Sequence, residues 1–590
     1  MVSASPFVVL DRFTDKSVAV FANPLKIITA ENPSEVVAAF KSVHGAIAAG
    51  HHVAGYMSYE LGYVLEERLL PLLPESRDVP LLWFGVFDKP EKLSATAADA
   101  WFAAHVTGRA YAGPLRFEPS RSAYAEAFKR AKAYIDAGDI YQVNLTIRGE
   151  FAFAGDPLAL YAGLRMRAAA PHAAYVFDGT RSVLSLSPEQ FFSVRNGVLT
   201  ARPMKGTSLR GATTEEDGAL RAALLASEKD RAENLMIVDL IRNDLSRVSE
   251  PGSVRVAEMF AIESFPSVHQ MVSTVTGNLR APTMPSDLVR ALFPCGSITG
   301  TPKIRAEEII RELEPHQRGV YCGAVGGFAP DGSADFNVAI RTLTISGGRG
   351  VLGIGSAVVA DSQEAGEYEE CLLKSRFYSD GRIPISLIET LLHDPARGFV
   401  REALHLDRMA RSASVFGLEF DRQAMLAAMR DAVAGRVGPT RVRLELSEEG
   451  RLDIKCESLP AASEVLTYAL SPLRLRSGDL LARHKTGWRA LYDQEFQRLR
   501  AETGCDQVIF LNERDELVEG NFTNLFVKID GGLVTPPLSS GALAGCLRRE
   551  LIESGACREG VLRLSDLEGD TYLGNSLRDL LPAVPIRFGS

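Results

Sequence analysis

Apolar and polar positions repeat with two different periods along this chain, and these periods predict both helices and strands. Apolar residues spaced three and four apart predict helices over 122–138, 215–245 and 301–314. Alternating or β-branched positions predict strands over 181–200 and 335–346. In the first helix, Ser122 is the expected N-cap and Gly138 the residue that follows the last turn. We therefore expect an α+β fold in which helices flank large β-sheets.

A break in this pattern near residue 380 divides the chain. The segment YSDGRIPIS, residues 378–386, gathers turn-forming residues between a charged helix and a new apolar start. Beyond it, the pattern predicts a helix over 404–417, a strand over 440–447 and a strand pair within 506–536. The sequence thus predicts a large domain over 1–380 and a smaller α+β domain over 381–590.

Composition narrows the setting in which this protein works. The chain has 590 residues, of which 46% are apolar and 24% charged, as in ordinary globular proteins. A net charge of −9 argues against nucleic acid as the main partner, and no apolar run of about 18 residues predicts a membrane span. Seven scattered cysteines without a CxxC pair, and an amino terminus without a basic signal region, predict a cytoplasmic protein with reduced thiols.

Two acidic pairs in the first part share one spacing. Asp230 and Glu233 lie three residues apart in one predicted helix, and Glu367 and Glu370 do so in another, with Lys374 one turn further on. If the two helix faces meet, their carboxylates could bind a hard divalent cation such as Mg²⁺. The alternative is that both pairs lie on solvated helix faces.

Several other residues of the first part are candidates for binding an anion. The glycines of GIGSAVVADS, residues 353–362, would let backbone amides approach one. CGSITGTPK lacks the spacing of a nucleotide-binding phosphate loop, although it suits a helix N-terminus that attracts an anion. Arg341 is expected within a strand, where a charge needs a partner or a ligand, and His269 is either a ligand-binding or a structural histidine.

An ordered set of motifs resembles one enzyme family. The motifs are GDIYQVNLT, SPEQFF, RPMKGT, DRAENLMIVDLIRNDL, FPCGSITGTPK, GVYCGAVG, NVAIRTL and ADSQEAGEYEECLLKS. Together they span about 120–377 and resemble the chorismate-utilising enzymes, which include anthranilate, isochorismate, salicylate and aminodeoxychorismate synthases. GYMSYELGY, residues 55–63, extends the resemblance towards the amino terminus.

The resemblance assigns the reaction through two positions. Family members that add water have a base lysine where this chain has Gln142, and members that make anthranilate have a small residue where it has Lys205. The combination found here resembles aminodeoxychorismate synthase component I, with Glu189 as the general acid. The resemblance also implies Mg²⁺ bound directly by Glu233 and Glu370, with Asp230 and Glu367 behind them through water.

The same resemblance implies a substrate site. Its predicted members are Arg341, Lys374, Tyr321, Gly353, Gly355, Ser356, His269 and Thr207. Many relatives have a third glycine where this chain has Ala357, so the contacts of this loop can differ.

A lysine suits this chemistry for a physical reason. The C4 hydroxyl of chorismate can be replaced by an amine through two successive displacements, the first by a nucleophile that adds at C2. A lysine amine can act if a nearby cation lowers its pKa and keeps it partly neutral. No amidotransferase motif is recognisable, so we expect ammonia from a separate glutamine amidotransferase subunit or from free ammonium.

The second part resembles another family, the class IV pyridoxal-phosphate enzymes. The motifs LHLDRMARSA, HKT, VEGNFTNLFV, TPPLSSGALAGCLR and YLGNSLRDL carry this resemblance across 384–580. It implies pyridoxal 5′-phosphate on Lys485, Glu519 at its ring nitrogen, and Arg408 with the backbone of Gly545, Cys546 and Leu547 at its phosphate. A homodimer through this domain is possible, and the domain is shorter than is usual for the class.

The two resemblances together predict a bifunctional protein of folate synthesis. The first part would convert chorismate to 4-amino-4-deoxychorismate, and the second would release pyruvate to give p-aminobenzoate. One alternative is a second part that is an aminotransferase of other specificity, or an inactive regulatory tail. Another is a first part that makes anthranilate.

Overall fold

A computed structural model describes residues 5–12, 17–265, 268–459 and 463–586, which form two compact units. The first unit comprises Met1–Ala103, Pro114–Phe151 and Tyr161–Gly381. The second comprises Arg382–Ser590 together with two short earlier segments, Ala104–Gly113 and Ala152–Leu160. Two pieces of the chain before residue 380 thus fold with the unit that follows it.

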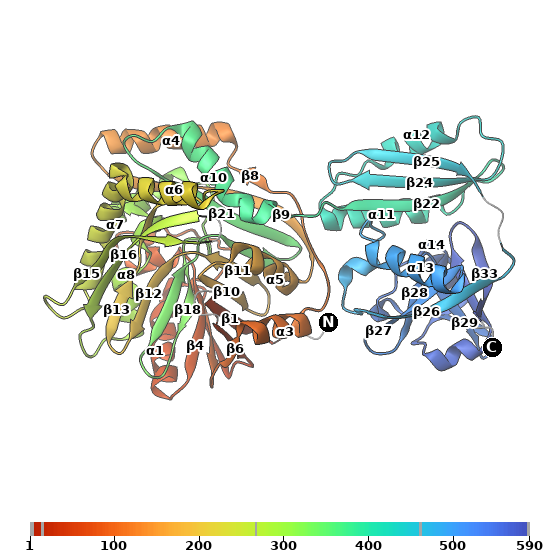
Figure 1. The fold of residues 1–590 in the computed structure, drawn as a ribbon, viewed down its shortest axis with the longest axis horizontal. Helices are drawn as coiled ribbons and strands as arrows, with labels where there is room; N and C mark the ends of the chain where they lie inside the picture. Colours follow the sequence, from red (N-terminus) through yellow and green to blue (C-terminus); the bar gives the residue numbers. More distant parts are fainter. Residues whose placement is uncertain (1–4, 13–16, 266–267, 460–462, 587–590) are drawn as a thin grey trace. The chain divides into compact units, whose positions relative to one another are not determined.

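The first unit is built around two β-sheets (Figure 1). In the described residues, the larger sheet has the order β17 (Gly300–Thr301), β9 (Gln142–Gly155), β21 (Arg349–Val358), β20 (Thr342–Ser346), β11 (Ser182–Ser187), β10 (His172–Phe177), β1 (Phe7–Arg12), β2 (Ser17–Ala22) and β6 (Glu91–Ser94), with β8 (Arg116–Glu118) on β9. β7 (Ala110–Ala112) pairs with the last residues of β9, and these two pieces belong to the second unit. The other has the order β14 (Met204–Leu209), β16 (Val268–Asn278), β13 (Val198–Ala201), β12 (Gln190–Arg195), β19 (Ala334–Val338), β18 (Ala324–Phe328), β4 (His52–Met57), β5 (Leu82–Phe87) and β3 (Lys26–Ala30), with β15 (Arg255–Ser264) on β16.

Side chains from both sheets meet in one apolar core. Val8 and Val176 come from the larger sheet, and Tyr56 and Val325 from the smaller. Each of these side chains is almost entirely removed from water, which is the main favourable contribution to folding. The sheets therefore pack face to face, and their edges and connections are left to carry polar groups.

The helices of the first unit lie outside these sheets. They are α1 (Pro33–Ala48), α2 (Leu61–Leu65), α3 (Ala95–His105), α4 (Arg121–Asp136), α5 (Pro157–Ala168), α6 (Thr214–Ala226), α7 (Glu228–Ser246), α8 (Pro285–Leu292), α9 (Lys303–Leu313) and α10 (Glu364–Ser379). The end of α3 and the start of α5 fall in the segments assigned to the second unit. The N-cap of α4 is Ser120 rather than Ser122, since the Ser120 hydroxyl accepts from the amide of Ala123. The stretch 215–245 is two helices, because Ser227 ends α6 and caps α7.

The second unit contains two further sheets. One has the order β23 (Gly398–Phe399), β22 (Ser386–Asp394), β24 (Thr440–Ser447) and β25 (Leu452–Ser458), accompanied by α11 (Glu402–Phe416) and α12 (Arg422–Val433). The other has the order β28 (Leu517–Gly520), β27 (Gln507–Asn512), β26 (Leu466–Leu475), β33 (Asp579–Pro585), β32 (Thr571–Asn575), β29 (Asn524–Ile529), β30 (Gly532–Thr535) and β31 (Cys557–Glu559), with α13 (Ala490–Thr503) and α14 (Cys546–Glu553).

These elements confirm the α+β class predicted for both parts. The strand predicted over 440–447 is β24, and the helix predicted over 404–417 is α11. The expected strand pair within 506–536 was wrong, because that stretch forms the four strands β27 to β30. Among the described residues, no helix combines the length and apolar character needed to cross a membrane.

Candidate functional site

Lys205 lies where β14 departs from regular pairing with β16. The register shifts between Met204 and Thr207, and Lys205 and Gly206 occupy this irregularity. Gly206 has a φ of +94°, and a Cβ there would lie 3.0 Å from the Cβ of Asp230 in the first turn of α7. The side-chain amide of Asn234 donates to the Lys205 carbonyl at 3.5 Å, so α7 is held against the strand that carries the lysine.

The charges around Lys205 act on its pKa in opposite directions. Burial lowers the pKa of the Lys205 amine below its ordinary value, and the charge of Lys374 adds to this effect. The carboxylates of Glu233, Glu189 and Glu370 oppose it, because they stabilise the ammonium form. The amine therefore remains easier to deprotonate than an exposed lysine while it lies among three carboxylates.

Glu189 follows β11 and is the acidic residue of the SPEQ motif. Its side chain is 4% exposed, and burial raises the pKa of its carboxyl to about 7. Within the described residues, its Oε1 has no hydrogen-bond partner. A carboxyl with this pKa is protonated in a large fraction of molecules near neutral pH and can donate a proton.

The second acidic pair lies at the start of α10. Glu370 pairs with Lys374 at 2.6 Å, and the Ser362 hydroxyl donates to Glu367 at 2.7 Å. Lys229 of α7 lies 3.5 Å from Asp361, which precedes α10, so the first turns of the two helices are neighbours.

These carboxylates are of the type that suits magnesium, but they are not gathered around one point. In the described part of the chain, Asp230, Glu233, Glu367 and Glu370 do not form a group whose oxygens all lie within 4.8 Å of one another. Carboxylate oxygens are nevertheless the ligands that Mg²⁺ prefers. The residue types therefore fit the ion, and its binding belongs to the function proposed below.

The glycines of β21 are explained by packing against neighbouring side chains. A Cβ on Gly353 would lie 2.2 Å from the ring of Tyr321, and one on Gly355 would lie 2.8 Å from Thr146. The Gly355 carbonyl accepts from Lys374 at 2.9 Å. Ser356 is fully buried, and no described residue is a partner for its hydroxyl.

The expectation that Arg341 lies within a strand was wrong. Arg341 has a φ of +49° and lies between β19 and β20, which belong to different sheets, so the chain crosses from one sheet to the other at this residue. Burial lowers the pKa of its guanidinium. No ion pair or hydrogen bond of this side chain occurs among the described residues, which leaves it available to an anionic group.

His269 is engaged by protein groups on both ring nitrogens. Nε2 donates to Asp217 at 3.0 Å, and Nδ1 lies 2.8 Å from the Ser264 hydroxyl. Asp217 also accepts two hydrogen bonds from Arg210, so the histidine is part of a network with α6. A substrate role for His269 stays a prediction that this geometry does not favour, and Thr207 lies exposed on β14 beside it.

In the second unit, the predicted cofactor residues line one cavity of about 540 Å³. Lys485 follows a short 3-10 helix, and its carbonyl accepts from the Ile388 amide at 2.8 Å. Burial, assisted by the charges of Arg408 and Arg489, lowers the pKa of the Lys485 amine to about 8. Also in the cavity wall are Arg408, Glu519, Gly545, Cys546 and Leu547.

Glu519 is held by two neighbours at the end of β28. Tyr492 donates to its Oε1 at 3.0 Å, and the Leu543 amide donates to its Oε2 at 2.9 Å. Burial raises the pKa of this carboxyl. α14 begins at Cys546, and a Cβ on the preceding Gly545 would collide with Asn524, so only glycine lets the backbone approach so closely.

A lysine, a buried carboxylate and a helix N-terminus in one cavity fit pyridoxal 5′-phosphate. The carboxylate can accept from the protonated ring nitrogen, and a helix N-terminus favours a phosphate. Arg408, predicted at the phosphate, donates its Nε and Nη2 to Glu389 at 2.8 and 2.6 Å and Nη1 to the Ala544 carbonyl. Its guanidinium is therefore largely engaged before any ligand arrives.

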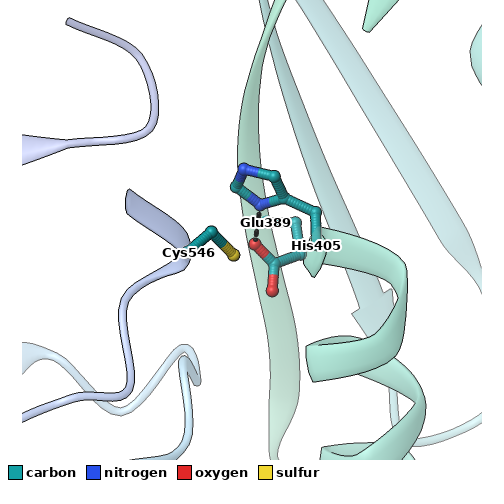
Figure 2. A group of neighbouring side chains, drawn as sticks. All are labelled: Glu389, His405 and Cys546. Atoms are coloured by element: carbon teal, nitrogen blue, oxygen red, sulfur yellow. Dashed lines mark hydrogen bonds and ion pairs between the residues drawn. The ribbon is translucent and has the colours of Figure 1, made fainter. Parts of the chain in front are cut away.

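The cavity wall includes part of a buried network that the sequence pattern did not indicate. Figure 2 shows Glu389, His405 and Cys546 close together, with the ring Nδ1 of His405 donating to Glu389 at 2.6 Å. His405 Nε2 lies 2.7 Å from the Ser576 hydroxyl. Burial by itself raises the pKa of Glu389, but the charges and hydrogen bonds of Arg408 and His405 together outweigh burial and lower this pKa to about 2.

This network is structural rather than a metal centre. The Glu389 oxygens are taken by Arg408 and His405, and a cation at that position would face the guanidinium. The signal for Glu389 was its place in the apolar run LIETLL, where a charged residue requires a buried partner.

Among the described residues, four further arginines line the cavity and were also missed, namely Arg441, Arg443, Arg489 and Arg578. Arg441 and Arg443 alternate along β24 and line the cavity, as does Arg489. Arg443 donates through Nη2 to Glu445 at 3.0 Å, while its buried Nη1 has no partner among the described residues. The alternation of arginine in TRVRLELS marked one strand face as charged, and only the fold shows that this face lines a cavity.

The fold places one lysine with a lowered pKa in each unit, and two known families match successive stretches of the chain. The family model of chorismate binding enzymes matches residues 5–380, and that of class IV aminotransferases matches residues 386–586. The chain belongs to the chorismate binding enzymes and carries, in addition, a class IV aminotransferase domain.

Individual relatives agree with this assignment. The chain is 45% identical over 297 residues to aminodeoxychorismate synthase component 1 of Klebsiella aerogenes, which covers 50% of this chain and 62% of that protein. It is 36% identical over 352 residues to the protein of the same name from Bacillus subtilis (strain 168), covering 54% and 74% of the two chains. The chain thus spans about three fifths of the Klebsiella protein.

A solved structure has the fold of the first unit. Anthranilate synthase component I from Streptococcus pneumoniae TIGR4 superposes with a TM-score of 0.53 at 25% identity, covering 64% of this chain and 92% of that one.

Proposed function

We propose that this protein makes p-aminobenzoate from chorismate in two steps, one in each unit. The observation that carries the proposal is the pair of lysines with lowered pKa values, Lys205 and Lys485, each within its own site on one chain. The named relatives of the first unit and the class IV family of the second support the same two steps.

In the first step, Lys205 acts as a nucleophile on chorismate. Its Nζ adds at C2, the two conjugated double bonds shift, and the hydroxyl leaves C4 as water with the proton of Glu189. Ammonia then adds at C4 and expels Lys205 from C2. The lowered pKa of Lys205 supplies the neutral amine, and the raised pKa of Glu189 supplies the acid.

The remaining residues of the first site would bind charge. Arg341 and Lys374 would pair with the carboxylates of the substrate, with Tyr321 and the backbone of Gly353–Ser356 beside the ring. Mg²⁺, held by Glu233 and Glu370 with Asp230 and Glu367 behind them, would neutralise the ring carboxylate.

We propose that ammonia comes from a glutamine amidotransferase partner, because the relatives are named as a component 1. All seven cysteines are free thiols, which supports a reducing, cytoplasmic setting. A homodimer through the second unit stays a prediction.

In the second step, Lys485 would move a proton of 4-amino-4-deoxychorismate. Pyridoxal 5′-phosphate, held by Lys485, Glu519 and the start of α14, would withdraw electrons from the substrate amine. Lys485 Nζ would then take the proton from C4, the C3–oxygen bond would break, and the leaving group would accept a proton to become pyruvate. The ring becomes aromatic as the bond breaks.

The arginines of the second cavity favour this lyase step over an aminotransferase of other specificity. 4-Amino-4-deoxychorismate carries two carboxylates, and Arg441, Arg443 and Arg489 provide more positive charge than an apolar amino acid needs. The buried Nη1 of Arg443 in particular has a donor to offer.

The test is to incubate the purified chain with chorismate, Mg²⁺, ammonium and pyridoxal 5′-phosphate, and to separate the products by chromatography. p-Aminobenzoate and pyruvate in equal amounts are expected. Accumulation of 4-amino-4-deoxychorismate alone would contradict the second step, and anthranilate would contradict the role given to Lys205.

A further inference from the structure

Two segments from within the chorismate-binding match fold as part of the second unit. β7 pairs antiparallel with the end of β9, matching Ala110 with Gly155 and Ala112 with Phe153. These residues belong to the unit that contains Lys485, although they precede it by more than three hundred positions. The paired segments 104–113 and 152–160 are called the inserted hairpin below.

Tyr111 anchors the inserted hairpin in the core of the second unit. Its side chain is fully buried, with ring centroids 5.1 Å from Phe416 and 6.1 Å from Trp488. Its hydroxyl donates to Glu448 at 2.7 Å. A buried aromatic ring with a satisfied hydroxyl contributes strongly to packing, so the hairpin is an integral part of this core.

Arg109 of the same hairpin contacts both ends of the loop that carries Lys485. Its Nε donates to Asp479 at 2.7 Å, six residues before the lysine, and its Nη1 donates to the Trp488 carbonyl at 3.1 Å, three residues after it. Asp479 in turn caps the short helix Leu480–Arg483 by accepting from the Leu481 amide. One guanidinium thus spans the base of the loop 479–488.

The backbone beside Arg109 also lies against this loop. A Cβ on Gly108 would be 2.6 Å from the Cα of Asp479, and one on Gly478 would be 3.2 Å from the Thr107 carbonyl. The contact therefore depends on glycine at both positions, and segments 107–109 and 478–479 approach each other closely.

The charge of Arg109 also acts on Tyr492, which is hydrogen-bonded to Glu519. Burial raises the pKa of Tyr492, and Arg109 is one of the charges that oppose this rise. Tyr492 donates to Glu519 on the cavity wall. A change at Arg109 is therefore expected to alter the electrostatics of the cavity as well as the loop.

We propose that the inserted hairpin is a working part of the pyridoxal-phosphate unit, with Arg109 as a positioning residue that holds the Lys485 loop for the cofactor. The inference rests on the proposed function of the second unit. It implies that this unit is incomplete when the chain is divided at residue 381, because sequence assigned to the first enzyme supplies its loop support.

The first experiment measures amide hydrogen exchange in the full-length protein without cofactor. Arg109→Ala is compared with the unchanged protein and with Arg422→Ala, a control in the same unit. Arg422 is 43% exposed and pairs with Asp407 at 2.6 Å, which matches Arg109 at 41% exposed with Asp479 at 2.7 Å. Exchange over 479–488 is expected to be about tenfold faster in Arg109→Ala and unchanged in the control.

The second experiment titrates pyridoxal 5′-phosphate and follows the absorbance of the bound cofactor against pH. Arg109→Ala is expected to bind it about tenfold more weakly and to shift the pH midpoint of its absorbance. Arg109→Lys keeps the charge and a donor for Asp479 but cannot also donate to the Trp488 carbonyl. Its affinity for the cofactor should therefore lie between that of Arg109→Ala and that of the unchanged protein. Chorismate consumption by the first unit reports that each variant is folded.

The outcomes separate this inference from the function on which it rests. If the unchanged protein binds no cofactor, the proposed function of the second unit fails, and the exchange measurement still tests the support of the loop. If it binds cofactor and Arg109→Ala matches it in exchange and in affinity, the positioning role is overturned. If Arg109→Ala loses chorismate consumption, that variant is misfolded and Arg109→Lys takes its place. The positioning role is then overturned if Arg109→Lys matches the unchanged protein in hydrogen exchange and in cofactor affinity.

Discussion

The sites around Lys205 and Lys485 both lower the pKa of a lysine by burial, yet the balance of neighbouring charge differs between them. Three glutamates oppose the shift at Lys205, with Lys374 as the cation that assists it. At Lys485, Arg408 and Arg489 assist the shift, and the pKa is lowered to about 8. Of the two acids near Lys485, Glu389 is already paired with Arg408.

This difference follows from what each lysine is proposed to do. Lys205 must attack a substrate and then leave it, and an acid nearby must supply a proton to the hydroxyl that departs. Lys485 must hold an anionic cofactor and accept a proton, for which arginines and a lowered pKa are suited. Neighbouring charge, rather than burial alone, thus distinguishes the two lysines.

The largest expected effect is the loss of one activity without the other when either lysine is replaced. Lys205→Ala should lower chorismate consumption by about 10³-fold or more, because the other amine of the site, that of Lys374, is paired with Glu370 and does not replace the nucleophile. The same variant should still convert supplied 4-amino-4-deoxychorismate to p-aminobenzoate at an unchanged rate. Lys485→Ala should show the reverse pattern, with the intermediate accumulating. Chromatography of both reactions checks this, and loss of both activities in either variant would contradict independent sites.

A smaller effect is expected from removing the acid of the first site. Glu189→Gln should reduce the turnover of chorismate by about 10²-fold with little change in KM, because the amide cannot donate the proton that the hydroxyl needs. In the unchanged protein, turnover at a constant concentration of neutral ammonia should fall as pH rises through about 7, where Glu189 loses its proton. If turnover does not fall above pH 7 in the unchanged protein, or if it still falls there in Glu189→Gln, Glu189 is not the general acid.

The arginines of the second cavity should affect binding more than chemistry. Arg443→Ala is expected to raise the KM for 4-amino-4-deoxychorismate by about 10- to 100-fold with a smaller change in kcat, because it removes a donor for a substrate carboxylate. Arg436→Ala, on an exposed turn outside the cavity, is the control. An unchanged KM in Arg443→Ala would leave the preference for a dicarboxylate without support.

The smallest expected effect concerns stability and tests the difference in charge directly. Since the folded pKa of Lys485 lies near 8 and the unfolded one near 10.5, the folded state binds fewer protons in that interval and stability should rise with pH across it. Without cofactor, Lys485→Met should therefore be stabilised by on the order of 2 kcal/mol at pH 7, allowing for the partial exposure of the side chain.

This gain should disappear as pH approaches 10.5, and it should be smaller for Lys205→Met, because carboxylates already stabilise that ammonium. Lys528→Met, at a half-exposed lysine of the second unit, is the control. Denaturant unfolding at several pH values measures all three. Equal gains at Lys205 and Lys485 would contradict the difference drawn between the sites.

Local pattern predicted some of the elements, but not their ends or the points where the chain crosses between sheets. β24 and α11 were recognisable because apolar residues repeat regularly along each of them, so that each presents one apolar face. The N-cap of α4 is Ser120 and not the expected Ser122, because both hydroxyls stand before the same apolar run and only backbone geometry selects one. Arg341 was placed in a strand because its neighbours alternate, whereas the chain turns there from one sheet to the other.

The candidate residues divide in the same way. The sequence by itself determined the α+β class, because this depends on local period, and Lys205 and Lys485 were predicted from motifs that are contiguous in the chain. The boundary predicted near residue 380 did not indicate that segments 104–113 and 152–160 fold with the second unit. The structure decided that His269 is engaged by Asp217 and Ser264, that Glu389 neutralises Arg408, and that Arg441 and Arg443 face a cavity. It also decided that Arg109 belongs with Lys485. Each of these is a contact between residues far apart in the chain, and such contacts depend on how strands and helices pack rather than on the order in which the residues occur.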